Sequence, residues 1–148
     1  MYRIAIISDI HGNIYALDAF LKDIKEKGIE FFYCPGDMIG IDPFSNEVLE
    51  TLFEIDTIQM ITGNHDESVL AVINNKPYLE SRINVMPHHE WIANRLKKEF
   101  VEGLSKLPRQ ITKTYDGHAL QFIHYPMNPS SYTTLLAKIH LMKLGCLQ

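Results

Sequence analysis

The chain has 148 residues, 46% of them apolar and 22% charged, which suits one domain, residues 1–148, with a hydrophobic core. The formal net charge of −4 argues against a general nucleic-acid binder, because such proteins carry a basic surface. No apolar run approaches the ~20 residues that span a bilayer, so we expect no membrane partner. A strand pattern follows Met1 directly, and Cys34 ends an apolar run. We therefore expect no signal peptide, a buried free thiol and a cytoplasmic protein.

The first half of the chain alternates strand and helix patterns. Asn13 is a candidate helix cap, and Gly28 is a candidate stop for the helix between them. The pattern predicts strands at 2–8, 29–34 and 56–61, with helices at 14–27 and 45–53. This order favours parallel strands with right-handed crossovers, whose ligand sites lie beyond the carboxyl ends of the strands.

The second half is less regular. We expect a short helix at 66–75, a loop or short helix at 76–88, and an amphipathic helix at 89–100 that buries Trp91. A hairpin should follow, with strands at 110–115 and 119–125 joined by Asp116-Gly117. The last expected element is a helix within 132–144. His88 and His89 precede one of these helices. Exposed capping residues are the favoured interpretation, and a surface metal site is the alternative.

Polar side chains follow four of the predicted strands. They are Asp9 and His11, then Asp37, then Asn64, His65 and Asp66, and finally His124. A single Asp after a strand is usually a cap or turn residue, and a single His is usually a bystander. Their coincidence at one edge of the molecule favours a metal centre.

Two divalent ions about 3.5–4 Å apart can clamp a phosphate ester and generate a hydroxide nucleophile. Asp, Asn and His are suitable ligands for Mn, Fe or Zn. A further His that binds no metal can protonate the leaving group. The residue types therefore suit phosphoester hydrolysis.

The motifs SDIHGN, PGDMIG and TGNHDE resemble the calcineurin-like metallophosphoesterase superfamily, in particular its small bacterial and archaeal branch, over residues 3–126. The resemblance implies an α/β sandwich of two mixed sheets flanked by helices. It also implies hydrolysis of small phosphomonoesters, phosphodiesters or nucleotides at a site with two divalent ions, whether Mn, Fe, Zn or Ni.

The same resemblance implies roles for single residues. Asp9 and His11 would bind the first metal, and Asp37 would bridge the two metals. Asn64 and His124 would bind the second metal. His65 resembles the family's acid, which also touches the phosphate. Asp66 would either orient His65 through its second ring nitrogen or stiffen the turn.

The resemblance breaks near the end of the chain. The family continues to a Gly-His-x-His motif, which supplies one His to each metal, and this motif is not found after His124. His118 is expected in an exposed turn, and His140 as a bystander on the terminal helix. Tyr125 stands where the family usually has Gly, and its side chain would crowd the phosphate.

Two interpretations of the missing motif stay open. The chain is either a truncated or degenerate member, acting as a non-catalytic subunit or scaffold with weak metal binding, or a compact variant. A compact variant would recruit His140, His88, His89 or a partner chain. Missing strands would leave a sheet edge open, which favours a homodimer. A monomeric mass in light scattering would count against that expectation.

Overall fold

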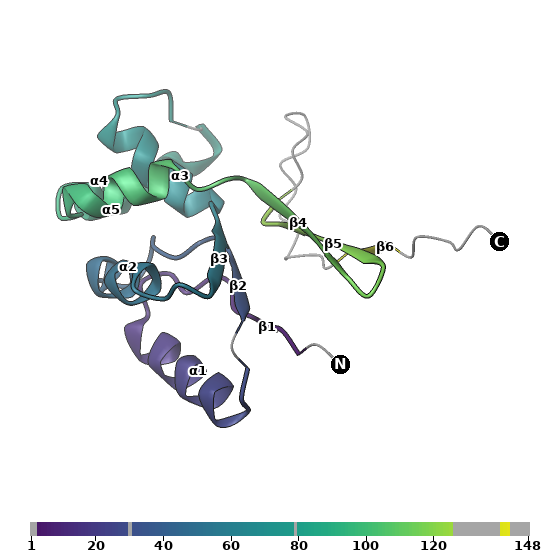
Figure 1. The fold of residues 1–148 in the computed structure, drawn as a ribbon. Coiled ribbons are helices and arrows are strands. Elements are labelled where there is room, and N and C mark those ends of the chain that lie inside the picture. The colour runs from purple at the N-terminus through teal and green to yellow at the C-terminus, as the bar shows by residue number, and fades with distance from the viewer. Residues whose placement is uncertain (1–2, 30, 79, 126–139, 143–148) are drawn as a thin grey trace.

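The computed structural model describes residues 3–29, 31–78, 80–125 and 140–142. Its first sheet is parallel, in the order β1 (Ala5–Ile6), β2 (Phe32–Pro35) and β3 (Ile58–Ile61). Phe32 of the central strand lies opposite Ala5 on one side and Ile58 on the other. The parallel order predicted from the alternating pattern is confirmed, and all three strands end at the same edge (Figure 1).

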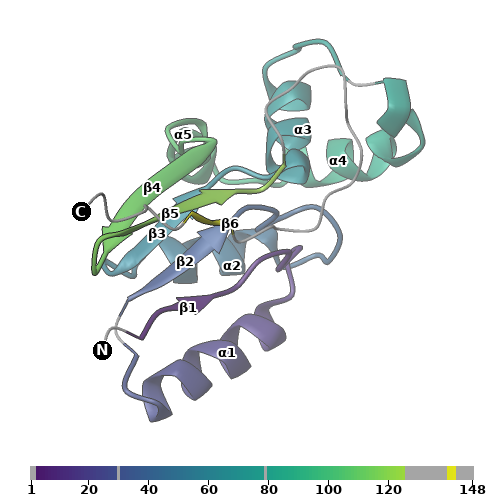
Figure 2. The same ribbon diagram turned by 90° about the vertical axis from the view of Figure 1, so that its right-hand side faces the viewer.

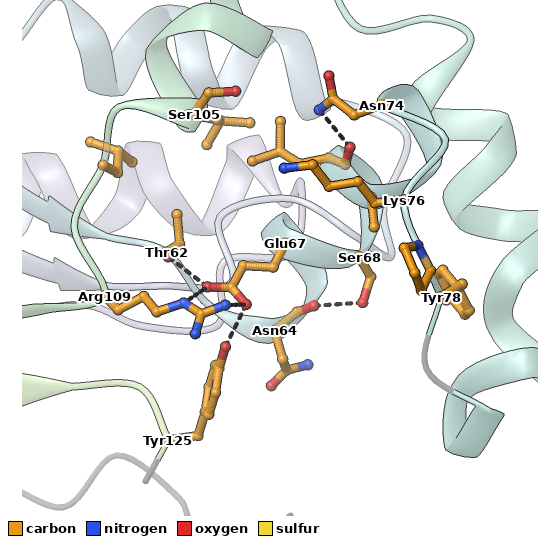
Figure 3. Close-up of a pocket in the computed structure, with 15 residues that line it drawn as sticks. Thr62, Asn64, Glu67, Ser68, Asn74, Lys76, Tyr78, Ser105, Arg109 and Tyr125 are labelled. Atoms are coloured by element: carbon orange, nitrogen blue, oxygen red, sulfur yellow. Dashed lines mark hydrogen bonds and ion pairs between the residues drawn. The ribbon is translucent and has the colours of Figure 1, made fainter. Parts of the chain in front are cut away.

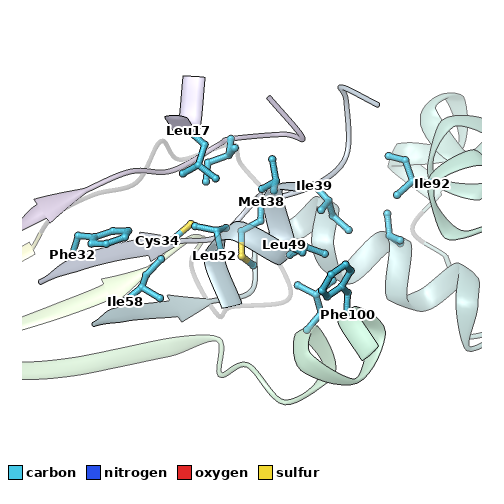
Figure 4. Packing of buried hydrophobic residues seen from close by; sticks show 14 of the residues in the cluster. Leu17, Phe32, Cys34, Met38, Ile39, Leu49, Leu52, Ile58, Ile92 and Phe100 are labelled. Carbon is cyan, nitrogen blue, oxygen red and sulfur yellow. The ribbon is translucent and has the colours of Figure 1, made fainter. Parts of the chain in front are cut away.

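Two helices cover one face of this sheet (Figure 1). The first, α1 (Ile14–Glu26), begins where the Asn13 side chain accepts a hydrogen bond of 3.0 Å from the amide of Ala16. The second, α2 (Ser45–Phe53), turns Leu49 and Leu52 inward, and both are fully buried. Figure 4 shows these side chains packed against Phe32, Cys34 and Ile58 of the sheet. Burial of this apolar surface holds the helices on the sheet.

The second sheet is antiparallel and contains β4 (Gln110–Tyr115), β5 (His118–Ile123) and β6 (His140–Met142), in that order. Asp116 and Gly117 join the first two strands, and both have positive φ, of 48° and 77°. These angles suit the tight hairpin turn predicted for this dipeptide.

The helix expected within 132–144 is wrong at 140–142, where His140 pairs with Gln121 in the sheet. The pairing supplies hydrogen-bond partners to the outer edge of β5, which a helix at 140–142 would not do. Residues 132–139 and 143–144 of that expected helix lie outside the described residues, and the structure describes no side chain for His140.

The second sheet packs on the face of the first sheet that α1 and α2 leave uncovered (Figures 1 and 2). Tyr33 of β2 stacks on Phe122 of β5 with ring centroids 3.9 Å apart, and its hydroxyl lies 2.6 Å from that of Tyr115. This layering confirms the expected α/β sandwich of two sheets flanked by helices. Within the described strands, one sheet is wholly parallel and the other wholly antiparallel.

A group of helices follows β3 and lies beyond the ends of the parallel strands (Figure 2). It comprises α3 (Asn64–Ile73), the 3₁₀ helix η1 (Glu80–Val85), α4 (Met86–Ala93) and α5 (Lys98–Ser105). No helix in the described part of the chain is long and apolar enough to cross a membrane.

The single helix expected at 89–100 is in fact two helices with a break at 94–97. The Asn46 side chain of α2 bonds the carbonyl of Arg95 and the amide of Lys97, at 2.9 and 3.0 Å. These bonds satisfy backbone groups that the break leaves open. Trp91 is 38% exposed and lies under the Arg95 guanidinium, whose central carbon is 4.2 Å from the ring, so its expected burial is wrong.

Candidate metal centre at the strand ends

The loops after β1 and β2 turn sharply at residues that are not glycine. Asp9, His11 and Asp37 have φ angles of 57°, 51° and 53°, in the left-handed region that such residues rarely adopt. Backbone bonds from the Asp9 amide to Gly36 and from the His11 amide to Asp37, at 3.2 and 2.9 Å, hold the two loops together. Strained backbone of this kind, of order 1–3 kcal/mol per residue, is concentrated at functional sites.

The five predicted metal ligands lie in one continuous group. The His11 Nε2 atom is 3.7 Å from a carboxylate oxygen of Asp9 and 3.9 Å from one of Asp37. The Nε2 atom of His124 is 3.2 Å from the same oxygen of Asp37 and 3.1 Å from the side-chain amide of Asn64. The structure therefore brings together residues from four segments that are far apart in the sequence.

The Asp37 carboxylate belongs to two sets of potential metal ligands. One set joins it with His11 and His65, and the other joins it with Asp9 and His124; within each set the ligand atoms lie within 4.8 Å of one another. A shared carboxylate is what a bridging ligand requires. The pairing differs from the expected one, because His11 falls with His65 and Asp9 falls with His124.

The buried side chains of Asp37 and His124 are in contact, with the carboxylate 3.2 Å from Nε2. Burial of Asp37, which is 2% exposed, would raise its pKa, but hydrogen bonds from His124 and from the His65 amide hold that pKa below its usual range. Burial lowers the pKa of His124, but the hydrogen bond and charge of Asp37, together with the bond to the Pro35 carbonyl, outweigh burial and raise that pKa. A divalent cation would bind the carboxylate of Asp37 and the neutral ring of His124, because imidazole ligates metal only when deprotonated.

The loops after β2 and β3 touch backbone to backbone through two glycines. A Cβ atom at Gly36 would lie 2.5 Å from the amide nitrogen of Gly63, and one at Gly63 would collide with the backbone and side chain of Asp37. Only glycine leaves room for this contact, which sets Asp37 beside Asn64 and His65.

We predict that Gly63→Ala destabilises the fold by about 2–3 kcal/mol and weakens metal binding at least about 10-fold, because the added methyl group pushes Asp37 aside. Urea unfolding and isothermal titration with Mn²⁺ check both effects. Gly117→Ala is the control: its φ of 77° costs about 1 kcal/mol, but no atom lies within 4 Å of the added carbon. Equal metal affinity in the two variants would contradict the prediction.

Asp66 is fully buried in the first turn of α3. Its carboxylate accepts hydrogen bonds from the amides of Asp37, Met38, Ile39 and Gly63, at 2.8–3.1 Å. These bonds match the alternative in which Asp66 stiffens the turns that carry the ligands. Within the described residues, no hydrogen bond joins Asp66 to the ring of His65.

The ring of His65 is held by a histidine that the sequence reasoning missed. Its Nδ1 lies 2.9 Å from Nε2 of His89, and its ring meets His11 edge to face with centroids 4.9 Å apart. Burial lowers the pKa of His65, against the charge of Asp37. His89 is fully buried, so the exposed cap expected there is wrong, whereas His88 is exposed.

The local pattern contained only a weak signal for this burial. His89 and Ile92 are three residues apart, share one face of α4, and are the two buried residues of that helix. Periodicity from Ile92 does not choose between the two histidines, because His88 lies four residues before Ile92 and His89 three, and both spacings place a residue on the same face.

A cavity of about 490 Å³ adjoins the candidate metal centre at Asn64 (Figure 3). Ser68, Tyr78 and Tyr125 also line it. The Tyr125 hydroxyl bonds the Glu67 carboxylate at 2.5 Å, in the wall of the cavity. The cavity offers space for an organic group next to the candidate ligands.

Comparison with known proteins identifies the family of this chain. The sequence model of the calcineurin-like phosphoesterase family matches residues 2–140. An uncharacterized protein of Methanocaldococcus jannaschii is 33% identical over 135 residues, which cover 89% of this chain and 53% of that protein. A symmetrical bis(5'-nucleosyl)-tetraphosphatase of Cronobacter sakazakii is 35% identical over 78 residues, which cover 49% of this chain and 28% of that enzyme.

Among solved structures, a metallophosphoesterase from Sphaerobacter thermophilus superposes with a TM-score of 0.60 and 28% identity. The match covers 76% of this chain and 44% of that one. This chain thus spans about half the length, or less, of the relatives it matches.

Proposed function

Since the chain belongs to the calcineurin-like phosphoesterase family, we propose that it hydrolyses phosphate esters with two divalent metal ions held at the strand ends. The observation that carries the proposal is the Asp37 carboxylate, which is shared by two sets of ligand atoms. Carboxylate oxygens and imidazole nitrogens are ligands that Mn, Fe, Ni and Zn accept, so the residues fit such ions.

Each side chain would have a distinct part in this site. Asp37 would bridge the ions, with His11 as a further ligand on one side, and Asp9, Asn64 and His124 as further ligands on the other. When bound, the ions would supply positive charge for the phosphate oxygens and acidify the attacking water. His65, which belongs to the set with His11, would act on the phosphate or the leaving-group oxygen.

The adjoining cavity favours a small organic phosphate, with its non-phosphate part beside Ser68 and Tyr78. The similarity to a bis(5'-nucleosyl)-tetraphosphatase, over about half of this chain, supports nucleotides as one class to test. The free, buried Cys34 supports a reducing, cytoplasmic location. A homodimer stays a prediction.

The proposal is tested with metal-free protein to which Mn²⁺, Zn²⁺, Fe²⁺, Ni²⁺ or Mg²⁺ is returned one at a time. We expect hydrolysis of bis(p-nitrophenyl) phosphate, p-nitrophenyl phosphate or diadenosine tetraphosphate with at least one of these ions, and none after chelation. No turnover of any of the three substrates with any ion would overturn the catalytic proposal.

A non-catalytic subunit or scaffold is the second candidate, because each set of ligand atoms among the described residues contains only three side chains. Metal content after dialysis separates the candidates. Two equivalents of tightly bound metal support the enzyme, and less than one equivalent without turnover supports the scaffold.

A further inference from the structure

Three side chains behind the metal centre form a continuous hydrogen-bond chain. The Tyr78 hydroxyl lies 2.5 Å from Nδ1 of His89, and Nε2 of His89 lies 2.9 Å from Nδ1 of His65. His89 is fully buried, and both of its ring nitrogens take part in these hydrogen bonds. It therefore has no nitrogen left for a metal ion, and the surface metal site considered for His88 and His89 does not use it.

The direction of the hydrogen bonds follows from acid–base chemistry. A neutral imidazole has one N–H donor and one acceptor nitrogen. It takes up a proton near pH ~6.5, whereas a neutral phenol does so only in strong acid, so the bond between Tyr78 and His89 runs O–H to N. Burial raises the pKa of Tyr78, which keeps that hydroxyl protonated at neutral pH.

The direction of the first hydrogen bond determines the direction of the second. With its Nδ1 accepting from Tyr78, His89 carries its proton on Nε2 and donates it to Nδ1 of His65. The His65 ring lies in one ligand set with His11 and Asp37, and its Nδ1 is taken up by His89. We infer that Tyr78 and His89 hold His65 in the tautomer that carries its proton on Nε2, as an N–H donor at the candidate metal centre. They are positioning residues, since they act through His65.

The chemical consequence rests on the proposed function. A neutral imidazole with a fixed Nε2–H donates a hydrogen bond to a phosphate or leaving-group oxygen and stabilises the charge that develops there. No proton has to leave the ring. The opposite tautomer would present a lone pair to the same oxygen and repel it. Tyr78 and His89 therefore select the Nε2–H tautomer, which can donate to that oxygen.

The tautomer is measured directly, without turnover, by two-bond ¹H–¹⁵N correlation of metal-free protein labelled on histidine, with His65 assigned from the His65→Asn spectrum. We expect the Nε2–H form of His65 in the wild type. Tyr78→Phe, which removes one hydroxyl, should give a mixture of tautomers. Tyr15→Phe is the control, because Tyr15 is 71% exposed on α1, and should leave the spectrum unchanged.

Kinetics give the second readout. Tyr78→Phe should lower kcat about 10-fold with unchanged metal content, as is typical for a residue that orients a site group. His89→Gln should retain more activity than His89→Leu, because its amide can still donate to Nδ1 of His65. If His89→Leu fails to fold, Tyr78→Phe alone decides.

The possible failures are distinguishable. An Nδ1–H tautomer of His65 in the wild type, or a tautomer unaffected by Tyr78→Phe, overturns this inference even if the protein is an active hydrolase. An inactive protein with the Nε2–H tautomer overturns the proposed function and leaves the inference on the hydrogen-bond chain standing.

Discussion

Replacing Asp37 by Asn is expected to lower kcat/KM for metal-dependent hydrolysis at least about 1,000-fold, which corresponds to ~4 kcal/mol of transition-state stabilisation. The side chain keeps its shape, and its amide oxygen can still accept the 2.8 Å hydrogen bond from the His65 amide. It loses the negative charge and the second oxygen, which lies near both His11 and His124. A neutral amide cannot bridge two cations.

Steady-state kinetics with saturating Mn²⁺ measure the loss, and calorimetric titration counts the ions bound. Asp18→Asn is the matched control, because Asp18 is an exposed carboxylate on α1, away from the strand ends. It should behave like the wild type. An Asp37→Asn variant that retains a tenth of the activity would show that the bridging role is wrong.

Asp66→Asn is expected to lower the free energy of unfolding by about 3 kcal/mol or more. Its carboxylate accepts four hydrogen bonds, all from backbone amides. An Asn has one oxygen and one NH₂ group, so half of these amides would face another donor. Buried donors without acceptors are what make this substitution costly, although it changes the side-chain volume little.

Urea unfolding followed by circular dichroism measures this loss in metal-free protein, so that metal binding does not contribute. Asp56→Asn, at an exposed turn before β3, is the matched control and should shift the midpoint little. If Asp66→Asn unfolds at the wild-type urea concentration, the four hydrogen bonds contribute little to folding, and the proposed stiffening of the turns fails with them.

Local patterns in the sequence were sufficient to predict most of the fold. The parallel order of the first three strands follows from their alternation with helices, and the hairpin turn follows from Asp116-Gly117. The break at 94–97 could not be predicted, because it depends on hydrogen bonds from Asn46, about 50 positions earlier in the chain. The strand at 140–142 likewise depends on a distant partner, β5.

The candidate site, too, could be predicted from the sequence only in part. Asp9, Asp37 and His124 could be predicted as neighbours, because residues that end parallel or adjoining strands meet at one edge. His89 comes from a helix whose packing no local rule determines, so its contact with His65 was missed. The ligand roles themselves stay predictions until metal binding is measured.

The position of His124 also connects metal binding with the packing of the two sheets. It comes from the end of β5 in the second sheet, while Asp37 follows β2 in the first, and its Nδ1 lies 2.7 Å from the carbonyl oxygen of Pro35. An ion held by both side chains would cross-link the two layers of the sandwich. Docking of the layers and metal affinity are then thermodynamically linked: whatever loosens one weakens the other by the same free energy.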